Sequence, residues 1–144
     1  MSFLTKLLGT STLKTKGGDI AVETLAGKNI FLYFSASWCP PCRGFTPVLA
    51  EYYKNHKDTK NFEVIFLTWD EEEDEFQEYF EHHPWTALDF NKCQEVMEGL
   101  NAKYKVESIP TLILLDKDGE MLARDARMKV PSDPTAAGFP YNTK

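Results

Sequence analysis

The stretch SASWCPPCRGF, residues 35–45, sets two cysteines around two prolines directly after the apolar run IFLYF of residues 30–34. A run that is almost wholly apolar predicts a central strand covered on both faces of a sheet. From Pro40 onward, apolar residues recur at three- and four-residue steps, a spacing typical of an amphipathic helix. Cys39 and Cys42 are therefore expected at the junction between a buried strand and a helix.

Three kinds of site use cysteines at this spacing: a zinc clip, a structural disulfide and a redox centre. The chain has 144 residues, 42% of them hydrophobic, which is enough for one core without a covalent staple. Its three cysteines are an odd number, which fits a disulfide framework poorly. A structural zinc site needs a second pair of ligands, and Cys93 with His56, His82 or His83 does not supply one at the usual spacing. The pattern favours the redox centre.

A redox centre at a helix start has a physical basis. Free backbone N–H groups and the helix dipole would stabilise a thiolate at Cys39, and the thiolate is the nucleophile. Cys42, one turn further along, is expected to be shielded and suited to attack a mixed disulfide at Cys39. Pro40 and Pro41 stiffen the loop and remove two N–H groups from the first turn. Trp38 is expected to form a flat apolar wall beside the nucleophile.

The rest of the chain alternates strand and helix patterns. The strands expected are residues 62–69 and a hairpin within 111–126 that turns at Lys117–Gly119, with Asp-Gly as the turn signal. An acid-headed helix should bury Phe76, Tyr79 and Phe80, and a third helix should bury one face that includes Cys93 and Tyr104. We expect one α/β domain spanning residues 1–144, with a mixed central sheet flanked by helices. About residues 1–25 form an extension packed on the core, and about residues 129–144 an irregular tail.

Several segments together resemble the tryparedoxins, trypanosomatid relatives of thioredoxin. They are FLYFSASWCPPCRGFTPVLAEYY (31–53), NFEVIFLTWDEEE (61–73), Pro84-Trp85, VESIPTLI (106–113) and the terminal FPY (139–141), and the resemblance covers nearly the whole chain. Thioredoxins proper carry Gly-Pro between their cysteines. Nucleoredoxins share a similar Cys-Pro-Pro-Cys site and are the nearest alternative. The tail departs from the family, since FPY replaces Phe-Pro-Trp and VPSDP (130–134) adds a proline.

The resemblance implies a thioredoxin-like fold and a dithiol–disulfide oxidoreductase that is fed by trypanothione, a bis(glutathionyl)spermidine dithiol. Its partners would be 2-Cys peroxiredoxin and glutathione-peroxidase-like peroxidases, for peroxide detoxification, and ribonucleotide reductase. Cys39 would be the nucleophile and Cys42 the resolving thiol, joined as the redox disulfide, with no metal and no other cofactor. The substrate surface would comprise Trp38, Pro40, Pro41, Trp69, Asp70, Glu71, Ile109, Pro110 and Arg127.

In thioredoxin-like folds the proline equivalent to Pro110 is cis and faces the cysteine pair. A trans bond is the default for an isolated Ile-Pro, because only about 5–6% of X–Pro bonds in folded proteins are cis. In combination with WCPPC (38–42), we expect the Ile109–Pro110 bond to be cis.

Other charged and polar residues have two readings each. Asp70 or Glu71 could relay a proton for Cys42, or belong to a solvated acidic helix cap. Arg127 could hold a glutathionyl carboxylate, or be a surface charge. Cys93 is expected in the core, and the three histidines on polar helix faces or ends.

Composition narrows the remaining possibilities. A formal net charge of −6 argues against nucleic-acid binding, and no apolar stretch approaches the roughly 20 residues that a membrane span needs. The first 18 residues contain lysines but no arginine, which makes a transit peptide the less favoured reading. We expect a cytoplasmic monomer, with a mitochondrial isoform as the alternative. Two other functions stay open: a reductase of the thioredoxin or nucleoredoxin kind that uses another electron donor, and a non-catalytic binding module.

Overall fold

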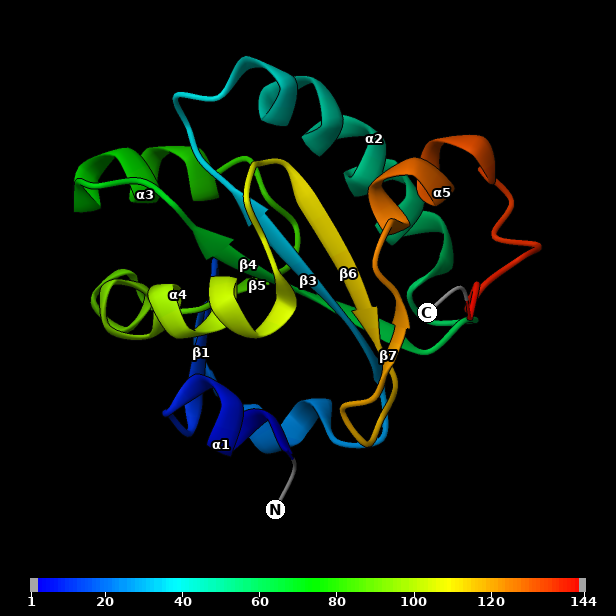
Figure 1. The fold of residues 1–144 in the computed structure, drawn as a ribbon, viewed down its shortest axis with the longest axis horizontal. Coiled ribbons are helices and arrows are strands. Elements are labelled where there is room, and N and C mark those ends of the chain that lie inside the picture. The colour runs from blue at the N-terminus through cyan, green and yellow to red at the C-terminus, as the bar shows by residue number, and fades with distance from the viewer. Residues whose placement is uncertain (1–2, 143–144) are drawn as a thin grey trace.

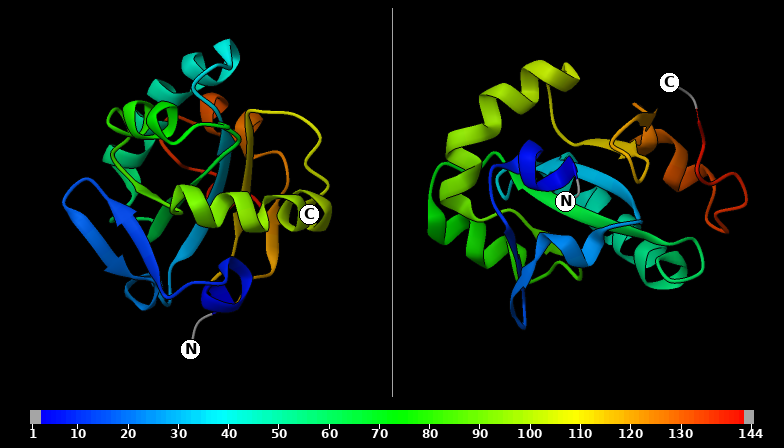
Figure 2. Two further views of the ribbon diagram at one scale, coloured as in Figure 1. Left: turned by 90° about the vertical axis from the view of Figure 1, so that its left-hand side faces the viewer. Right: turned by 90° about the horizontal axis from the view of Figure 1, so that it is seen from below.

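The computed structural model describes residues 3–142, which form a mixed seven-stranded sheet packed between helices (Figures 1 and 2). The helices are α1 (Phe3–Leu8), α2 (Pro40–His56), α3 (Glu73–Phe80), α4 (Phe90–Tyr104) and α5 (Ala126–Ser132), with a short 3₁₀ turn at Val22–Leu25. The strands are β1 (Thr12–Thr15), β2 (Gly18–Ala21), β3 (Asn29–Ser35), β4 (Phe62–Thr68), β5 (Thr86–Ala87), β6 (Thr111–Leu115) and β7 (Met121–Ala123). This architecture confirms the expected α/β class with a mixed, helix-flanked sheet.

The strand order β2-β1-β5-β4-β3-β6-β7 brings three distant loops to one edge of the sheet. β3 and β4 are parallel and in register from Asn29↔Phe62 to Ser35↔Thr68, so the segments that follow them leave from the same edge. β6 runs antiparallel to β3 and begins opposite Phe34, so the segment that precedes β6 reaches that edge as well. The cysteine pair, residues 69–70 and the Ile109–Pro110 step are therefore gathered together.

Alternation along β3 divides the core into two layers. Phe31 and Tyr33 pack with α2, α3 and α5, whereas Ile30, Leu32 and Phe34 pack with α1 and α4. Every residue from Ile30 to Ser35 is buried, as expected for a central strand.

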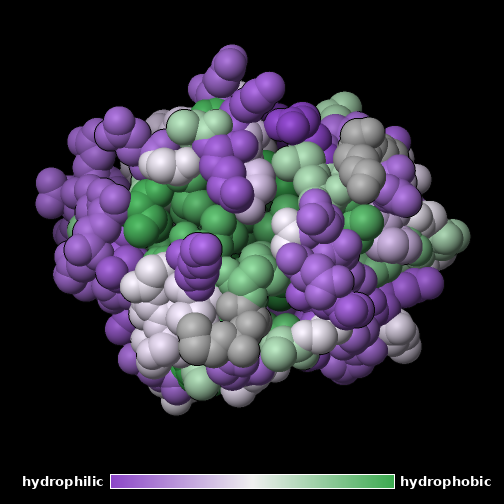
Figure 3. Space-filling model, turned by 60° about the horizontal axis from the view of Figure 1, so that its bottom comes forward, coloured by the Kyte–Doolittle hydropathy of each residue, from purple (hydrophilic) through white to green (hydrophobic). Residues whose placement is uncertain are grey.

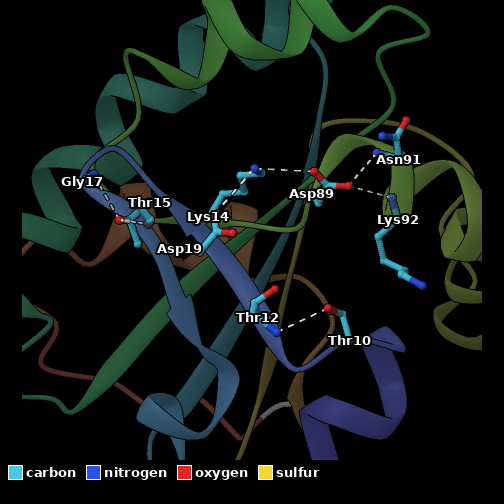
Figure 4. Close-up of polar contacts among 10 residues, drawn as sticks. Thr10, Thr12, Lys14, Thr15, Gly17, Asp19, Asp89, Asn91 and Lys92 are labelled. Carbon is cyan, nitrogen blue, oxygen red and sulfur yellow. Dashed lines mark hydrogen bonds and ion pairs between the residues drawn. The ribbon is translucent and has the colours of Figure 1, made fainter.

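The N-terminal segment is more regular than predicted. Residues 12–21 form the antiparallel hairpin β1–β2, which extends the sheet through the pairing of Lys14 with Ala87 in β5. Figure 4 shows the Lys14 ammonium between Asp19, at 3.7 Å, and Asp89, at 3.8 Å. Asp89 also caps α4 by accepting hydrogen bonds from two backbone N–H groups. The hairpin buries little beyond Leu13, so it carries no strong apolar pattern.

The C-terminal prediction was wrong for residues 129–132, which complete α5 rather than an irregular tail. Val130 is buried against the core, which explains why a helix forms over so short a segment. Beyond α5 the chain is irregular, and hydrogen bonds to the Asp133 side chain stabilise its conformation. The carboxylate accepts hydrogen bonds from the N–H groups of Ala137 and Gly138 and from the Tyr141 hydroxyl.

A hollow of about 620 Å³ lies between α1, α4 and the β6–β7 turn, and Figure 3 shows hydrophobic side chains gathered on this face. Its lining includes Phe3, Leu7, Val96 and Leu100. At the turn, Gly119 has a φ of +90°, and a Cβ there would lie 2.9 Å from the Phe3 ring. The hollow lies at the opposite end of β6 from the cysteine pair.

Candidate active site

The cysteine pair begins α2. Cys39 is the N-cap residue, it is joined to Cys42 by a disulfide, and the two Cα atoms are 5.2 Å apart. The Cys39 side chain is 5% exposed and that of Cys42 is fully buried. Trp38, in contrast, is 54% exposed. Of the two cysteines, Cys39 alone retains some exposed surface, and it follows the exposed Trp38.

The first turn of α2 offers few donors to the Cys39 sulfur. The first two helical positions are Pro40 and Pro41, which carry no N–H. The N–H of Arg43 bonds to the carbonyl of Cys39. The N–H of Cys42 lies 3.3 Å from Cys39 Sγ and donates to it. Together with the helix dipole, this N–H would stabilise a thiolate at Cys39.

The loop before β6 faces the disulfide. The Ile109–Pro110 peptide bond is cis, which confirms the expectation. Cys39 Sγ lies 3.8 Å from the carbonyl oxygen of Ile109. Ile109 and Trp69 both pack against the cluster of Ala36 and the two cysteines. Residues from three separate segments thus enclose one sulfur pair.

Asp70 is fully buried, so the reading of this residue as part of a solvated helix cap was wrong. Its Oδ1 accepts hydrogen bonds from the N–H of Ser37, at 2.9 Å, and from the Ser37 hydroxyl, at 2.7 Å. Its Oδ2 accepts one from the Thr68 hydroxyl, at 2.8 Å. The carboxylate thereby ties the end of β4 to the loop that leads to Cys39, and α3 begins only at Glu73.

Two candidate residues differ from Asp70 in their exposure to solvent. Glu71 and Arg127 are exposed. Arg127 lies in the first turn of α5. Their predicted roles require a substrate that extends beyond the sulfur pair.

A cavity of about 320 Å³ adjoins Trp38 between α2 and α3. It is lined by Ser37, Trp38, Arg43, Glu75, Glu78, Tyr79 and His82. Desolvation and the carboxylates of Asp70, Asp74 and Glu72 raise the pKa of Glu75. Glu75 and Glu78 therefore form an acidic wall on the α3 side of this cavity, whereas Arg43 lines it from α2.

One of the three histidines lies in the core. His83 is fully buried, so its expected polar surroundings were wrong. The rings of Phe66, Tyr79 and Trp85 surround it, and its Nδ1 accepts a hydrogen bond from Trp85 Nε1 at 3.2 Å. Burial, followed by the charges of His82 and Lys16, lowers the pKa of His83 to about 3. His83 is thus a neutral core residue.

The third cysteine is buried and unpaired, as expected. Cys93 Sγ lies 3.7 Å from the carbonyl oxygen of Leu88, and burial raises the pKa of the thiol to about 12. Within residues 3–142 no group of three or more His, Cys, Asp or Glu side chains could hold a metal ion. In the same part of the chain, no helix has the length and hydrophobicity that a membrane crossing requires.

Comparisons with known proteins agree with this geometry. Residues 27–121 match the family model described as thioredoxin-like. Tryparedoxin of Trypanosoma brucei brucei is 50% identical over 98% of this chain and 99% of its own length. Nucleoredoxin of Bos taurus is 40% identical over 92% of this chain, which spans 30% of that protein.

Solved structures give the same result. Native tryparedoxin I from Crithidia fasciculata superposes with a TM-score of 0.94 at 48% identity, covering 99% of this chain and 100% of that one. A tryparedoxin II complexed with glutathionylspermidine has a TM-score of 0.94 at 41% identity, with the same coverage of both chains. The expected thioredoxin-like fold is confirmed.

Proposed function

Because the chain belongs to the tryparedoxins, within the thioredoxin-like family, and is a dithiol–disulfide oxidoreductase, we propose that it carries electrons from trypanothione to peroxidases. The observation that carries this proposal is the likeness to tryparedoxin over almost the whole length of both chains. The likeness to a tryparedoxin solved with glutathionylspermidine supports a glutathionyl-polyamine thiol as the donor.

The proposed reaction runs through the Cys39–Cys42 pair in two exchanges. The Cys39 thiolate attacks a disulfide of the oxidised peroxidase, forms a mixed disulfide and releases one partner thiolate. Cys42 then loses its proton and attacks the Cys39 sulfur, which releases the second partner thiol and closes the Cys39–Cys42 disulfide. The two thiols of trypanothione reduce this disulfide by the reverse sequence and become trypanothione disulfide.

The geometry supports a division of labour between the two cysteines. Cys39 sits at the helix start near the exposed Trp38, whereas Cys42 is buried. In the proposed reaction the backbone of Ile109, whose carbonyl oxygen lies 3.8 Å from Cys39 Sγ, would pair with an extended partner strand. For proton transfer with Cys42 we assign Asp70 rather than Glu71, because Asp70 is buried at this edge and Glu71 is exposed.

The proposed partners are a 2-Cys peroxiredoxin, a glutathione-peroxidase-like peroxidase and ribonucleotide reductase, each of which presents a disulfide for reduction. The acidic wall beside Trp38 would attract the cationic spermidine portion of trypanothione. Arg127 would bind a glutathionyl carboxylate. The setting proposed for this exchange is the cytoplasm.

A coupled assay tests the electron route. NADPH oxidation is followed with trypanothione reductase, trypanothione, a peroxidase and this protein, and compared with Cys39→Ser and Cys42→Ser. The proposal expects turnover that requires trypanothione and is lost in both variants. Activity with thioredoxin reductase in place of the trypanothione system would move the chain to another electron donor, and activity with neither would reject the proposed electron route.

A further inference from the structure

Four buried hydroxyl groups form a chain of hydrogen bonds behind the disulfide. Ser35 Oγ lies 2.8 Å from Tyr79 Oη, which lies 2.9 Å from Thr46 Oγ1. Thr46 Oγ1 lies 2.7 Å from Tyr33 Oη, and Tyr33 Oη lies 3.4 Å from the carbonyl oxygen of Cys42. The four side chains are at most 6% exposed and come from β3, α2 and α3. The resolving cysteine is thus connected to three elements at once.

The last hydrogen bond of the series determines which group donates in each of the others. A carbonyl oxygen only accepts hydrogen bonds, so the Tyr33 hydroxyl donates to Cys42. Each hydroxyl has one hydrogen, so Thr46 must donate to Tyr33, Tyr79 to Thr46, and Ser35 to Tyr79. Removing any one hydroxyl therefore interrupts a single ordered path. Burial, together with the neighbouring Tyr79, raises the pKa of Tyr33, so the Tyr33 hydroxyl keeps its proton across the physiological range.

α2 lacks one hydrogen bond next to Cys42, because Pro47, inside the helix, has no N–H to donate to the carbonyl of Arg43. The orientation of Cys42 therefore depends more than usual on contacts from outside the helix. That orientation matters for the chemistry, because the N–H of Cys42 donates to the Cys39 sulfur.

We infer that the hydroxyl chain Ser35–Tyr79–Thr46–Tyr33 is a positioning network for the thiol–disulfide exchange. It holds the carbonyl of Cys42, keeps the N–H of Cys42 directed at Cys39 Sγ, and so sets how reactive the Cys39 thiolate is. The inference rests on the proposed role of Cys39 as the nucleophile. Tyr33, Thr46 and Tyr79 act on the sulfur atoms through the backbone of Cys42, which makes them positioning residues.

Two charged residues also bind the segment that leads to Cys39. Substitutions in the hydroxyl network do not remove either of them. Arg43 donates to the carbonyl of Ser37 at 2.9 Å, and its guanidinium lies 5.8 Å from the centre of the Tyr79 ring. Asp70 accepts from the Ser37 N–H and hydroxyl. A Phe in place of Tyr79 keeps the ring under Arg43 and removes only the hydroxyl.

The test is the pH dependence of Cys39 alkylation in the reduced protein, read by mass spectrometry of the labelled peptides. Tyr33→Phe, Thr46→Val and Tyr79→Phe each remove a different hydroxyl group from the hydrogen-bonded series and keep the bulk of the side chain. We expect alkylation of Cys39 below its thiolate pKa to slow about three- to tenfold, the equivalent of losing one hydrogen bond's worth of stabilisation. Thr46→Ser, which keeps the hydroxyl, should restore most of the rate.

Tyr52→Phe is the matched control, because the Tyr52 hydroxyl bonds to that of Tyr141 at the edge of the same aromatic core, in the C-terminal half of α2. It should leave Cys39 alkylation unchanged. If the three network variants lower the melting temperature and yet titrate Cys39 like the wild type, the hydroxyls are structural only and the inference is overturned. Three independent variants keep the test decisive if one fails to fold. The readout needs neither trypanothione nor a peroxidase, so its failure is distinct from failure of the proposed electron route.

Discussion

Cys39 and Cys93 show how far position decides the chemistry of one side chain. Cys39 caps a helix and receives a backbone N–H, whereas Cys93 is enclosed by the core with its pKa raised by burial to about 12. The spacing of Cys39 and Cys42 after an apolar strand was sufficient to predict the first environment, and the apolar helix face that carries Cys93 to predict the second.

Cys93 is expected to resist alkylation in the native, reduced protein. At neutral pH its thiolate population should be roughly a thousandfold or more below that of an ordinary cysteine, and its burial adds to this. Limited labelling with iodoacetamide, followed by peptide mapping, should find Cys39 modified first and Cys93 modified only after unfolding in guanidinium. Comparable labelling of both residues in the native protein would contradict this placement.

Arg127→Ala is expected to raise the KM for trypanothione about two- to fivefold with little change in kcat, because an exposed charge pair contributes modestly to binding. The measurement is steady-state kinetics with trypanothione as the varied substrate. Lys129→Ala, which removes a charge from the same helix, serves as the control. A KM equal to that of the wild type would remove Arg127 from the substrate surface.

The residues that sequence reasoning misplaced are polar side chains in the interior. Asp70 stands in an acidic run and His83 in a polar one, so composition alone placed both in solvent. Their burial depends on partners that are distant in sequence: Ser37 for Asp70, and the rings of Tyr33 in β3 and Phe66 in β4 for His83. The hydroxyl network had one signal in the sequence: Tyr33 and Ser35 stand at i and i+2, which places both hydroxyl groups on one face of an apolar strand.

At the scale of elements, the strength of the apolar pattern decided what could be predicted. β3, β4, the β6–β7 hairpin and helices α2 to α4 each bury a continuous apolar face, and all were expected. The β1–β2 hairpin, the two-residue β5 and α5 are short and bury few side chains, so their positions follow from pairing and packing rather than from a local pattern. Register between β3 and β4 could not be read from the sequence, and it is what brings the site together.

β4 carries a buried carboxyl group that should make stability depend on pH. Glu63 accepts a hydrogen bond from the N–H of Val64, and burial raises its pKa above the ordinary glutamate value. The folded state therefore favours the protonated form. Its contribution to stability is fully present below the unfolded-state pKa and is lost as the pH rises through the folded-state pKa.

Glu63→Gln should remove this loss, so that the variant gains stability relative to the wild type as the pH rises from about 4.5, the ordinary glutamate range. Urea unfolding across the pH range measures the difference. Glu51→Gln, at an exposed position on α2, should leave the pH profile unchanged. Parallel stability curves for wild type and Glu63→Gln would show that this carboxyl group does not carry the pH dependence.

At the scale of the whole molecule, negative charge should favour reduction of the disulfide by a cationic thiol over reduction by an uncharged one. The formal net charge is −6, and an acidic wall lies beside Trp38. Added salt should therefore slow reduction by cationic trypanothione more than reduction by an uncharged dithiol such as dithiothreitol. Glu75→Gln combined with Glu78→Gln should flatten the salt dependence for trypanothione. Equal salt slopes for the two donors would exclude electrostatic attraction.

The placement of the three tryptophans has an optical consequence. Trp69 packs against the disulfide and Trp38 precedes Cys39, whereas Trp85 is buried beside His83 in the other layer. A disulfide in contact with an excited indole accepts an electron from it and quenches its emission. The oxidised protein should therefore fluoresce less than the reduced protein, with Trp69 carrying most of the difference. The fold supplies its own reporter, and single turnovers can be timed by stopped-flow fluorescence without a label.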